Sequence, residues 1–208
     1  MIRTIFFFVI LWLSLLVSML LFLPWLFLLH RSLREIRIRY TGYCTRLWAR
    51  LVIWSSGSEI QVLGKELIPG DPDFIIISNH QGYMDIPVLM SVFPFALAFV
   101  AKKELMYVPF INCWLLGLGA IVINRNKPLL SMRKLEAEMI KPRENPIVLF
   151  PEGTRSKTGS EGKSKPGGLR MVKISGKKNV HVQISGSYRI WEEKKRIRPG
   201  RIMVNISE

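Results

Sequence analysis

The segment NHQGYMD, residues 79–85, places a histidine and an aspartate five residues apart, directly after an apolar run. Neither a helix nor a strand brings side chains at this spacing together, so the chain must turn between them. Gly82 makes such a turn easy, and Asp85 with Pro87 soon after it is typical of an N-cap at the start of a helix. His80 is therefore a candidate general base, and Asp85 is a candidate for the carboxylate that holds its ring. The pattern alone is a weak signal, because a surface histidine near a helix-capping aspartate would look the same.

A second motif, PEGTRS at residues 151–156, also follows an apolar run. Arg155 presents a planar fork of N–H donors that suits a phosphate. Glu152 could hold an arginine or accept a substrate hydroxyl, and Gly153 allows the backbone to approach a ligand closely. Thr154 lies in the same turn. The motif therefore predicts a turn that binds a phosphate group.

Further basic residues follow two other apolar runs. Arg125 comes after AIVIN, and Lys102 and Lys103 come after a run that ends at residue 101. Each of them, taken alone, is more often a solvated surface charge than a ligand. In open α/β sheets, however, ligands gather at the carboxyl ends of strands. The coincidence of all these groups at strand ends predicts one site beside His80.

The elements that would position this site alternate between strands and helices. Continuously apolar strands such as FIIIS and IVLF are typical of a sheet covered on both faces. The pattern predicts an α/β fold, a mixed sheet covered by helices. We expect strands at residues 59–63, 74–78, 96–101, 120–124, 146–150, 180–185 and 201–206, and helices at residues 85–92, 104–116, 128–141 and 167–175.

An uncharged apolar run of 25 residues occupies residues 5–29. It is long enough for a helix to cross the hydrocarbon core of a bilayer. A cleaved signal peptide is the competing interpretation, but the run is long for one and lacks a small-x-small cleavage pattern. Pro24 could kink the helix, so a segment that enters one leaflet and returns is also consistent. We expect an uncleaved membrane segment.

The chain is strongly basic, with 30 basic and 15 acidic residues and a net charge of +15. Nucleic acid, an anionic membrane surface or anionic substrates could each explain this balance. The apolar run favours the membrane, and no recognised nucleic-acid-binding motif is present. Arginines concentrate after the run, which by the positive-inside rule predicts that the body of the protein faces the cytoplasm. These residues are Arg31, Arg34, Arg37, Arg39, Arg46 and Arg50.

Apolar residues recur at three- and four-residue steps over residues 33–54, which predicts a second helix with a basic side. This helix could lie on a bilayer surface, pack on the domain, or do both. We therefore expect an N-terminal membrane-associated helical pair in residues 1–57 and a catalytic domain in residues 58–208. Cys44 and Cys113 lack metal-ligand spacing and suggest no disulfide framework.

Four segments together resemble the glycerolipid acyltransferase family. They are NHQGYMD, the region from KEL through PF to INR at residues 103–125, FPEGTRS, and the strand VHVQISG, and they have the order and spacing of the family's motifs. Within the family, the resemblance is greatest to bacterial members that acylate lysophosphatidic acid. Two departures exist: the family usually has proline where this chain has His181, and commonly aspartate where it has Asn124. We interpret His181 as a strand residue rather than a second base.

The resemblance implies transfer of a fatty acyl group from acyl-CoA or acyl carrier protein to the sn-2 hydroxyl of lysophosphatidic acid, which gives phosphatidic acid. His80 would take the hydroxyl proton, and Asp85 would hold the histidine ring. The acceptor's phosphate would be bound by basic residues, with Glu152 and Gly153 shaping the pocket. The resemblance implies neither a metal nor a redox cofactor. The phosphate-binding residues would be Arg155 and Arg125, with help from Lys102 or Lys103.

Other functions remain open at this point. The acceptor could be lyso-ornithine lipid, a lysophosphatidylcholine-type lipid or glycerol 3-phosphate. Alternatively, the chain could be a non-catalytic protein that binds anionic lipid, although the intact His80, Asp85, Glu152 and Arg155 argue against it. A nucleic-acid binder would explain the charge but not the apolar run.

Overall fold

The computed structural model describes residues 1–27, 33–160 and 162–208. Within these residues, seven strands form one sheet in the order β1-β7-β6-β2-β5-β3-β4. Only the β6–β7 pair is antiparallel, and the other neighbours are parallel. The predicted mixed sheet is therefore confirmed. The strands are β1 (Glu59–Leu63), β2 (Ile75–Ser78), β3 (Ala98–Lys102), β4 (Ile121–Ile123), β5 (Ile147–Leu149), β6 (Asn179–Ser185) and β7 (Arg201–Ser207).

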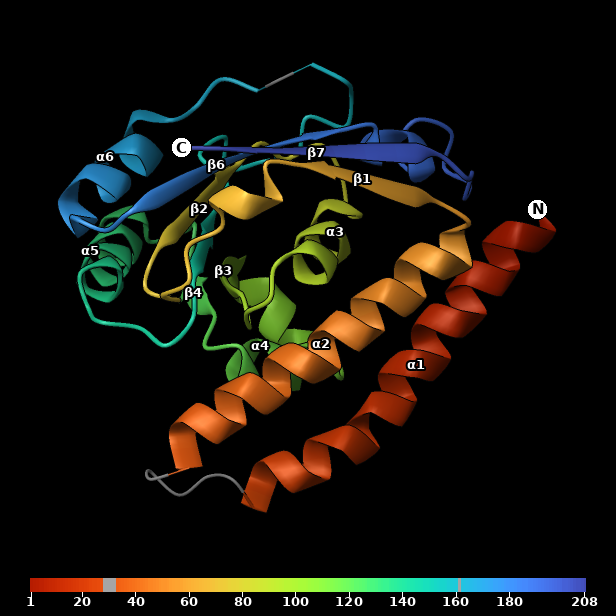
Figure 1. Cartoon of the computed structure of the whole chain (residues 1–208), viewed down its shortest axis with the longest axis horizontal. Coiled ribbons are helices and arrows are strands. Elements are labelled where there is room, and N and C mark those ends of the chain that lie inside the picture. Colours follow the sequence, from red (N-terminus) through yellow and green to blue (C-terminus); the bar gives the residue numbers. More distant parts are fainter. Residues whose placement is uncertain (28–32, 161) are drawn as a thin grey trace.

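Helices cover both faces of this sheet (Figure 1). They are α1 (Ile2–Phe27), α2 (Arg34–Ser56), α3 (Asp85–Val92), α4 (Ile111–Gly117), α5 (Pro128–Met139) and α6 (Pro166–Ser175), with 3-10 turns η2 (Lys65–Leu67), η3 (Lys103–Tyr107) and η4 (Ser187–Ile190). Alternate residues of β2 enter different clusters. Ile76 packs with residues of α2 and α3, whereas Ile75 and Ile77 pack with residues of α5 and α6. This is why the central strand is continuously apolar.

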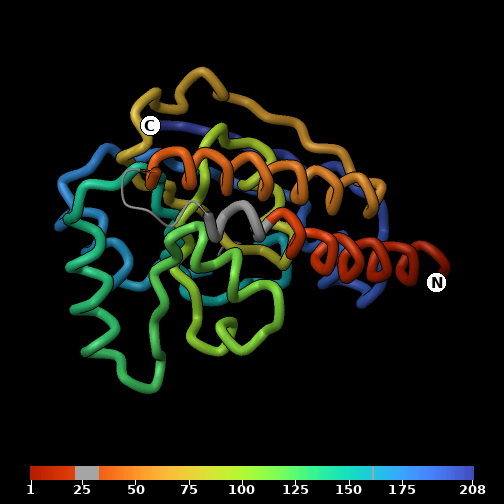
Figure 2. Tube along the Cα trace, turned by 90° about the horizontal axis from the view of Figure 1, so that it is seen from below, coloured from red at the N-terminus to blue at the C-terminus, as the bar shows by residue number. Residues whose placement is uncertain are grey.

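The N-terminal helices run side by side, and α2 lies between α1 and the domain (Figures 1 and 2). Ala49, Val52 and Ile53 of α2 belong to the same hydrophobic cluster as α3. The aromatic rings of Phe6 and Trp54 pack edge to face, with centroids 6.1 Å apart. The second helix therefore packs on the domain, which was one of the two interpretations open for it.

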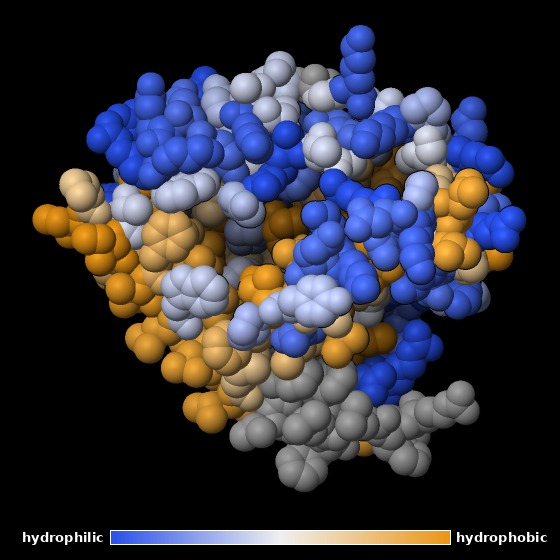
Figure 3. Space-filling model, turned by 180° about the vertical axis from the view of Figure 1, so that it is seen from behind, coloured by the Kyte–Doolittle hydropathy of each residue, from blue (hydrophilic) through white to orange (hydrophobic). Residues whose placement is uncertain are grey.

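Helix α1 presents an apolar surface. Over residues 2–21 it has the length and composition of a membrane span, a property that signal sequences share, and little of this stretch is buried. Its exposed side chains include Val9, Leu13 and Leu16. Figure 3 shows hydrophobic side chains gathered along the side of the molecule where α1 lies. Residues 28 and 29 of the expected segment, and Arg31, lie outside the described residues.

One predicted helix is wrong. The pattern over residues 104–116 predicts a single helix, but the chain forms the 3-10 turn η3, a break, and then α4. Pro109 causes the break, because proline has no N–H to donate and restricts the residue before it. Phe110 follows with a φ of 67°, which is not helical. The other predicted elements occur within about two residues of their expected bounds, the usual uncertainty of element ends.

Candidate active site

His80 and Asp85 meet where β2 ends and α3 begins. The Nδ1 atom of His80 lies 2.7 Å from Oδ2 of Asp85. The chain turns between them at Gly82, whose carbonyl accepts the amide N–H of Asp85. Asp85 is the first residue of α3 and not its N-cap, which is Met84. Its carboxylate instead accepts hydrogen bonds from the loop before the helix.

Four donors converge on the Asp85 carboxylate, which is fully buried. Besides the His80 ring, Oδ2 accepts the amide N–H groups of Gln81 at 2.7 Å and Gly82 at 2.8 Å. Oδ1 accepts the hydroxyl of Ser187. A carboxyl group that only accepts hydrogen bonds is ionised, and charge-assisted bonds of this kind offset its burial. We therefore assign the proton of His80 to Nδ1, which leaves Nε2 with a free lone pair.

The His80 ring is fixed by stacking as well as by this hydrogen bond. The ring of Phe150 lies parallel to it, with centroids 4.1 Å apart and an interplanar angle of 18°. The His80 side chain is 17% exposed. The His80 ring is thus held in one orientation and is largely, but not completely, shielded from solvent.

Glu152 joins the two motifs in a way that the sequence did not indicate. Its Oε1 accepts the amide N–H of His80 at 3.1 Å, so the backbone holds this oxygen, while its buried Oε2 has no hydrogen-bond partner within the described residues. Glu152 is buried. Its turn is fixed to the loop by the amide of Ser156, which donates to His80 O at 2.8 Å. Gly153 has a φ of 68°, a conformation that favours glycine.

Arg125 and Arg155 both reach this turn. Arg125 Nη2 donates to the carbonyl oxygen of Gly153 at 2.6 Å. The Arg155 guanidinium lies 3.7 Å above the ring of Tyr83 and 3.9 Å from a carboxylate oxygen of Glu192. Its buried Nη1 donates no hydrogen bond within the described residues. Two guanidinium groups thus flank the turn, and one of them has an unused donor.

The remaining predicted residues are not in contact with His80 or Asp85. Lys102 forms an exposed ion pair with Glu104 at 3.3 Å, and Lys103 is exposed at the start of η3. Thr154 is exposed in the turn. A backbone hydrogen bond is the main cause that lowers the pKa of the exposed Glu104, and the nearby Lys102 lowers it further.

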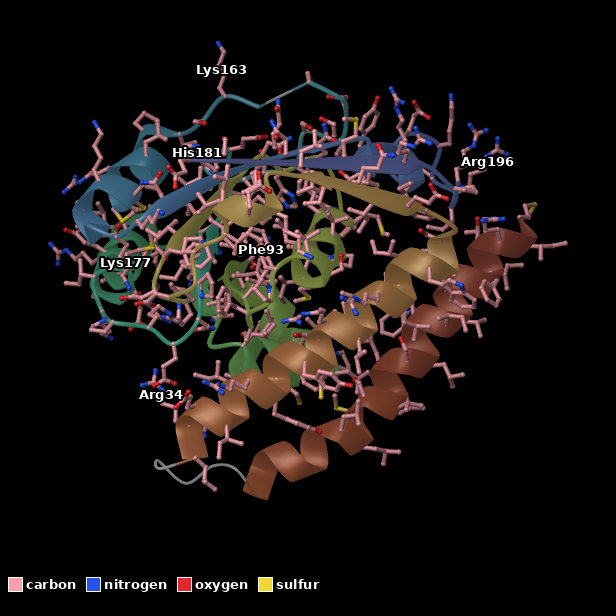
Figure 4. The ribbon with its side chains drawn as sticks, viewed as in Figure 1. Arg34, Phe93, Lys163, Lys177, His181 and Arg196 are labelled. Atoms are coloured by element: carbon pink, nitrogen blue, oxygen red, sulfur yellow. The ribbon has the colours of Figure 1, made fainter. Side chains whose placement is uncertain are left out.

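His181 lies within strand β6, as expected, and its side chain is exposed. It pairs with Ile77, whose side chain faces α5 and α6. Figure 4 shows His181 on the sheet and Phe93 beneath it, in the layer of α3. The position therefore gives His181 no contact with the His80 ring.

Sequence reasoning missed Ser187 and Glu192. Both are buried and come from the segment after β6. Glu192 Oε1 accepts the amide N–H of Tyr83 at 2.7 Å, and burial raises the pKa of this carboxyl group. Glycine at position 82 leaves room for this carboxylate, because a Cβ there would clash with Glu192 Oε2 at 2.4 Å. Neither residue belongs to a recognisable motif, and nothing in local spacing links it to residues about 100 positions earlier.

The loop amides around the base are all occupied. Those of residues 80, 81, 82 and 83 donate to the carboxylates of Glu152, Asp85 and Glu192. In the turn that contains Gly153, by contrast, the amides of Thr154 and Arg155 donate to no acceptor within the described residues. Within the described residues, this turn therefore has backbone N–H groups without an acceptor, whereas residues 80–83 of the loop do not.

Comparison with known proteins gives consistent results. A family model described as Acyltransferase matches residues 59–184. The chain is 34% identical to the 1-acyl-sn-glycerol-3-phosphate acyltransferase of Borreliella burgdorferi over 63% of this chain and 53% of that protein. It is 34% identical to the enzyme of the same name from Pseudomonas aeruginosa over 67% of this chain and 56% of that protein. The chain thus spans about half the length of these curated relatives.

The fold has been seen before. The crystal structure of the 1-acyl-sn-glycerophosphate (LPA) acyltransferase PlsC from Thermotoga maritima superimposes with a TM-score of 0.86 and 24% sequence identity. The match covers all of this chain and 83% of that one. The likeness therefore includes the N-terminal helices as well as the sheet.

Proposed function

This chain belongs to the acyltransferase family, and from that premise we propose that it transfers a fatty acyl group from a thioester to the sn-2 hydroxyl of lysophosphatidic acid. The observation that carries the proposal is the hydrogen-bonded pair of His80 and the buried Asp85, with Nε2 of His80 free to accept a proton. The names of the relatives from Borreliella burgdorferi and Pseudomonas aeruginosa support this acceptor. The product is phosphatidic acid, as in phospholipid biosynthesis.

In the proposed step, His80 accepts and then returns the proton that the reaction displaces. The acceptor's hydroxyl oxygen attacks the thioester carbon while its proton passes to Nε2 of His80. The C–S bond then breaks, and the departing thiolate takes the proton back from the imidazolium. Asp85 fixes the ring and stabilises its positive charge, as the acid does in a serine protease triad. The substrate hydroxyl takes the place of the serine, so the reaction requires no acyl-enzyme, metal or redox cofactor.

The turn beside the base supplies the remaining groups. The free amides of Thr154 and Arg155 are the proposed donors to the tetrahedral oxyanion. Arg155 and Arg125 would bind the phosphate, since the guanidinium groups of both residues flank the turn. Lys102 and Lys103 would attract the anionic acceptor from further away. The thioester donor is acyl-CoA or acyl carrier protein.

The setting of the reaction is a membrane surface. The apolar exposed face of α1 and the membership of the family support membrane association. The excess of arginines after α1 places the site, in this proposal, on the cytoplasmic side. Acceptor and product are both lipids, so this location gives the site access to each.

A panel of acceptors tests the function. Purified protein in detergent receives labelled acyl-CoA or labelled acyl carrier protein with lysophosphatidic acid, lysophosphatidylcholine, lyso-ornithine lipid or glycerol 3-phosphate. We expect labelled phosphatidic acid to be the principal product. Product from another acceptor alone would keep the mechanism and replace the substrate. No product from any pair, by a folded protein, would favour the non-catalytic lipid-binding function.

Arg155→Ala separates binding of the phosphate from chemistry. A lost charge-assisted hydrogen bond costs about 1.5–3 kcal/mol, so we expect KM for lysophosphatidic acid to rise about tenfold or more. Lys163→Ala, an exposed residue of the long loop after the turn, serves as the control that removes the same charge. An unchanged KM with an unchanged rate would remove Arg155 from the phosphate site.

A further inference from the structure

A groove separate from the His80–Asp85 site lies between α2, β1 and the end of α3. Its volume is about 670 Å³, within the range of small-molecule sites. We call it the α2 groove. Its lining combines basic, apolar and small residues, among them Arg46, Arg50, Trp54, Ile60, Lys65 and Ser91.

The charge in the α2 groove is of one sign. Arg46 and Arg50 are one helical turn apart on the same side of α2, and Lys65 lies across from them on η2. No aspartate or glutamate is among the lining residues, and within the described chain none of the three basic residues forms an ion pair. The acidic residue Glu59 of β1 alternates away from Ile60, which lines the groove. The groove is therefore a concave cationic surface with no internal counter-charge.

Arg46 has an unpaired hydrogen-bond donor within the described residues. Its buried Nε has no hydrogen-bond partner within the described residues. Burial, together with the positive charge of Arg50, lowers the pKa of Arg46. A buried donor without an acceptor is costly, and two like charges one turn apart repel each other. An anion between the two guanidinium groups would offset the repulsion between them.

The mouth of the α2 groove is apolar and aromatic. Trp54 lines the groove, is 65% exposed, and packs on Phe6 of α1. The groove therefore opens beside the exposed apolar side of α1. Tryptophan favours the boundary between hydrocarbon and water. A ligand with a charged head and apolar chains in a bilayer would meet the groove in this orientation.

We propose that the α2 groove binds an acidic phospholipid of the membrane, with its phosphate between Arg46 and Arg50 and its acyl chains beside Trp54 and α1. Helix α3 separates this groove from the reaction. Asp85 begins α3 and Val92 ends it, so about 10 Å of helix lies between the dyad and the groove. The lipid would position the enzyme on the bilayer and would not be the acyl acceptor. The inference does not depend on the identity of the acceptor.

The test measures binding of dihexanoyl phosphatidylglycerol, with dihexanoyl phosphatidylcholine as the neutral comparison, by titration calorimetry in neutral detergent. The protein carries Arg125→Gln and Arg155→Gln, so the phosphate site of the proposed reaction is disabled. We expect the acidic lipid to bind at one site and the neutral lipid to bind about tenfold or more weakly. Adding Arg46→Gln and Arg50→Gln should lower the affinity for the acidic lipid about tenfold or more.

The matched control is Arg34→Gln with Arg39→Gln, which removes two arginines from the same helix outside the groove. It should change the affinity less than threefold. A second variant, Ser91→Phe, fills the groove without changing charge and should also abolish binding, while melting curves verify folding.

Three results would overturn the proposal. Equal losses in the groove and control variants would mean general attraction between a basic helix and anionic lipid. Absence of binding once Arg125 and Arg155 are replaced, when the unmodified protein binds, would place the lipid at the catalytic site. An unchanged affinity for the acidic lipid in the Arg46→Gln/Arg50→Gln and Ser91→Phe variants would place the lipid outside the groove.

Discussion

Asp85 receives more hydrogen bonds than its role as a partner of His80 requires. Two loop amides and the Ser187 hydroxyl hold it in addition to the imidazole. In a buried position, each of these bonds stabilises the negative charge and restricts the carboxylate to one orientation. In the proposed mechanism, Ser187 is thus a positioning residue that acts on His80 through Asp85.

Ser187→Ala should lower kcat about tenfold with little change in KM, since a lost charge-assisted bond costs about 1.5–3 kcal/mol and acts on the proton transfer. In an Asp85→Asn background the same substitution should have almost no further effect. Steady-state kinetics of the double-mutant cycle measure this, with Ser185→Ala, on an exposed position of β6, as the control. Additive losses in the cycle would mean that Ser187 acts independently of Asp85.

Glu192 gives the fold a pH dependence. Burial raises the pKa of its carboxyl group above 4.5, so the folded protein keeps this proton at pH values where the unfolded chain has lost it. The contribution of Glu192 to stability therefore falls as pH rises through the window above 4.5. Glu192→Gln keeps an oxygen for the Tyr83 amide and cannot ionise.

We expect the melting temperature of Glu192→Gln, relative to wild type, to increase as the pH is raised from 4.5 to 7.5. Thermal melting in detergent across this range provides the measurement, and Glu193→Gln, at an exposed neighbouring position, is the control. A difference between variant and wild type that does not depend on pH would show that Arg155 offsets the burial of Glu192 completely.

The pair His80 and Asp85 could be predicted at the scale of residues because both partners lie in one short loop. The roles of Glu152, Ser187 and Glu192 could not. Their partners are backbone amides and a carboxylate from distant segments, and pairing of this kind leaves no spacing rule in the sequence. Phe150 illustrates the same limit, because an aromatic residue at a strand end does not reveal which ring it will stack against.

At the scale of elements, the close approach of α2 to the domain depends on Gly42. A Cβ at this position would lie 2.7 Å from the backbone nitrogen of Ala96, which is closer than real contacts allow. Helix α2 therefore rests directly on the segment that leads into β3. This contact fixes the helix that carries the α2 groove.

Gly42→Ala should destabilise the protein by about 1–2 kcal/mol, because overpacking costs about 1–3 kcal/mol and alanine regains up to about 1 kcal/mol of helix propensity. Urea unfolding monitored by fluorescence gives this value. Gly70→Ala is the control, since a Cβ there meets nothing within 4 Å. Equal stability of the Gly42 variant and wild type would show that α2 shifts freely on the domain.

Most elements could be predicted because their apolar patterns are continuous or periodic. The strands β2 and β5 are buried on both faces, so their runs of isoleucine, valine and leucine mark them clearly. The prediction of a single helix over residues 104–116 was wrong at Pro109. The apolar residues of this segment recur at helical spacing, and that pattern was given more weight than the proline, which breaks a helix. Strand order was not predictable, because the last strand, β7, pairs with the first strand, β1, which lies far away in the sequence.

At the scale of the whole molecule, the two halves of the surface differ. The side along α1 is apolar, while hydrophilic residues cover much of the sheet side (Figure 3). The α1 helix is tied to the domain by polar contacts, including the bond from Trp114 Nε1 to Ser18 Oγ at 2.9 Å. This arrangement holds the apolar side of α1 on one face of the molecule, the face that would contact lipid in the proposed function.

Leu13→Gln with Leu16→Gln should lower the partitioning of the protein into phospholipid vesicles at least about tenfold, because each buried leucine contributes about 1.5–3 kcal/mol. Vesicle flotation measures the bound fraction. Leu129→Gln with Leu130→Gln, two exposed leucines of α5, is the matched control. Equal release in both pairs would contradict the assignment of α1 as the lipid-facing element.

The proposed mechanism requires that His80 accept the proton of a lipid hydroxyl during acyl transfer. Its most direct test is single-turnover formation of labelled phosphatidic acid from lysophosphatidic acid by wild type, His80→Ala and Asp85→Asn, with lysolipid binding measured in parallel. General-base catalysis contributes about 10²–10⁴ in rate. The account predicts that His80→Ala loses the rate by at least this factor while it binds the lysolipid nearly as wild type does. A near-wild-type rate in His80→Ala would contradict it.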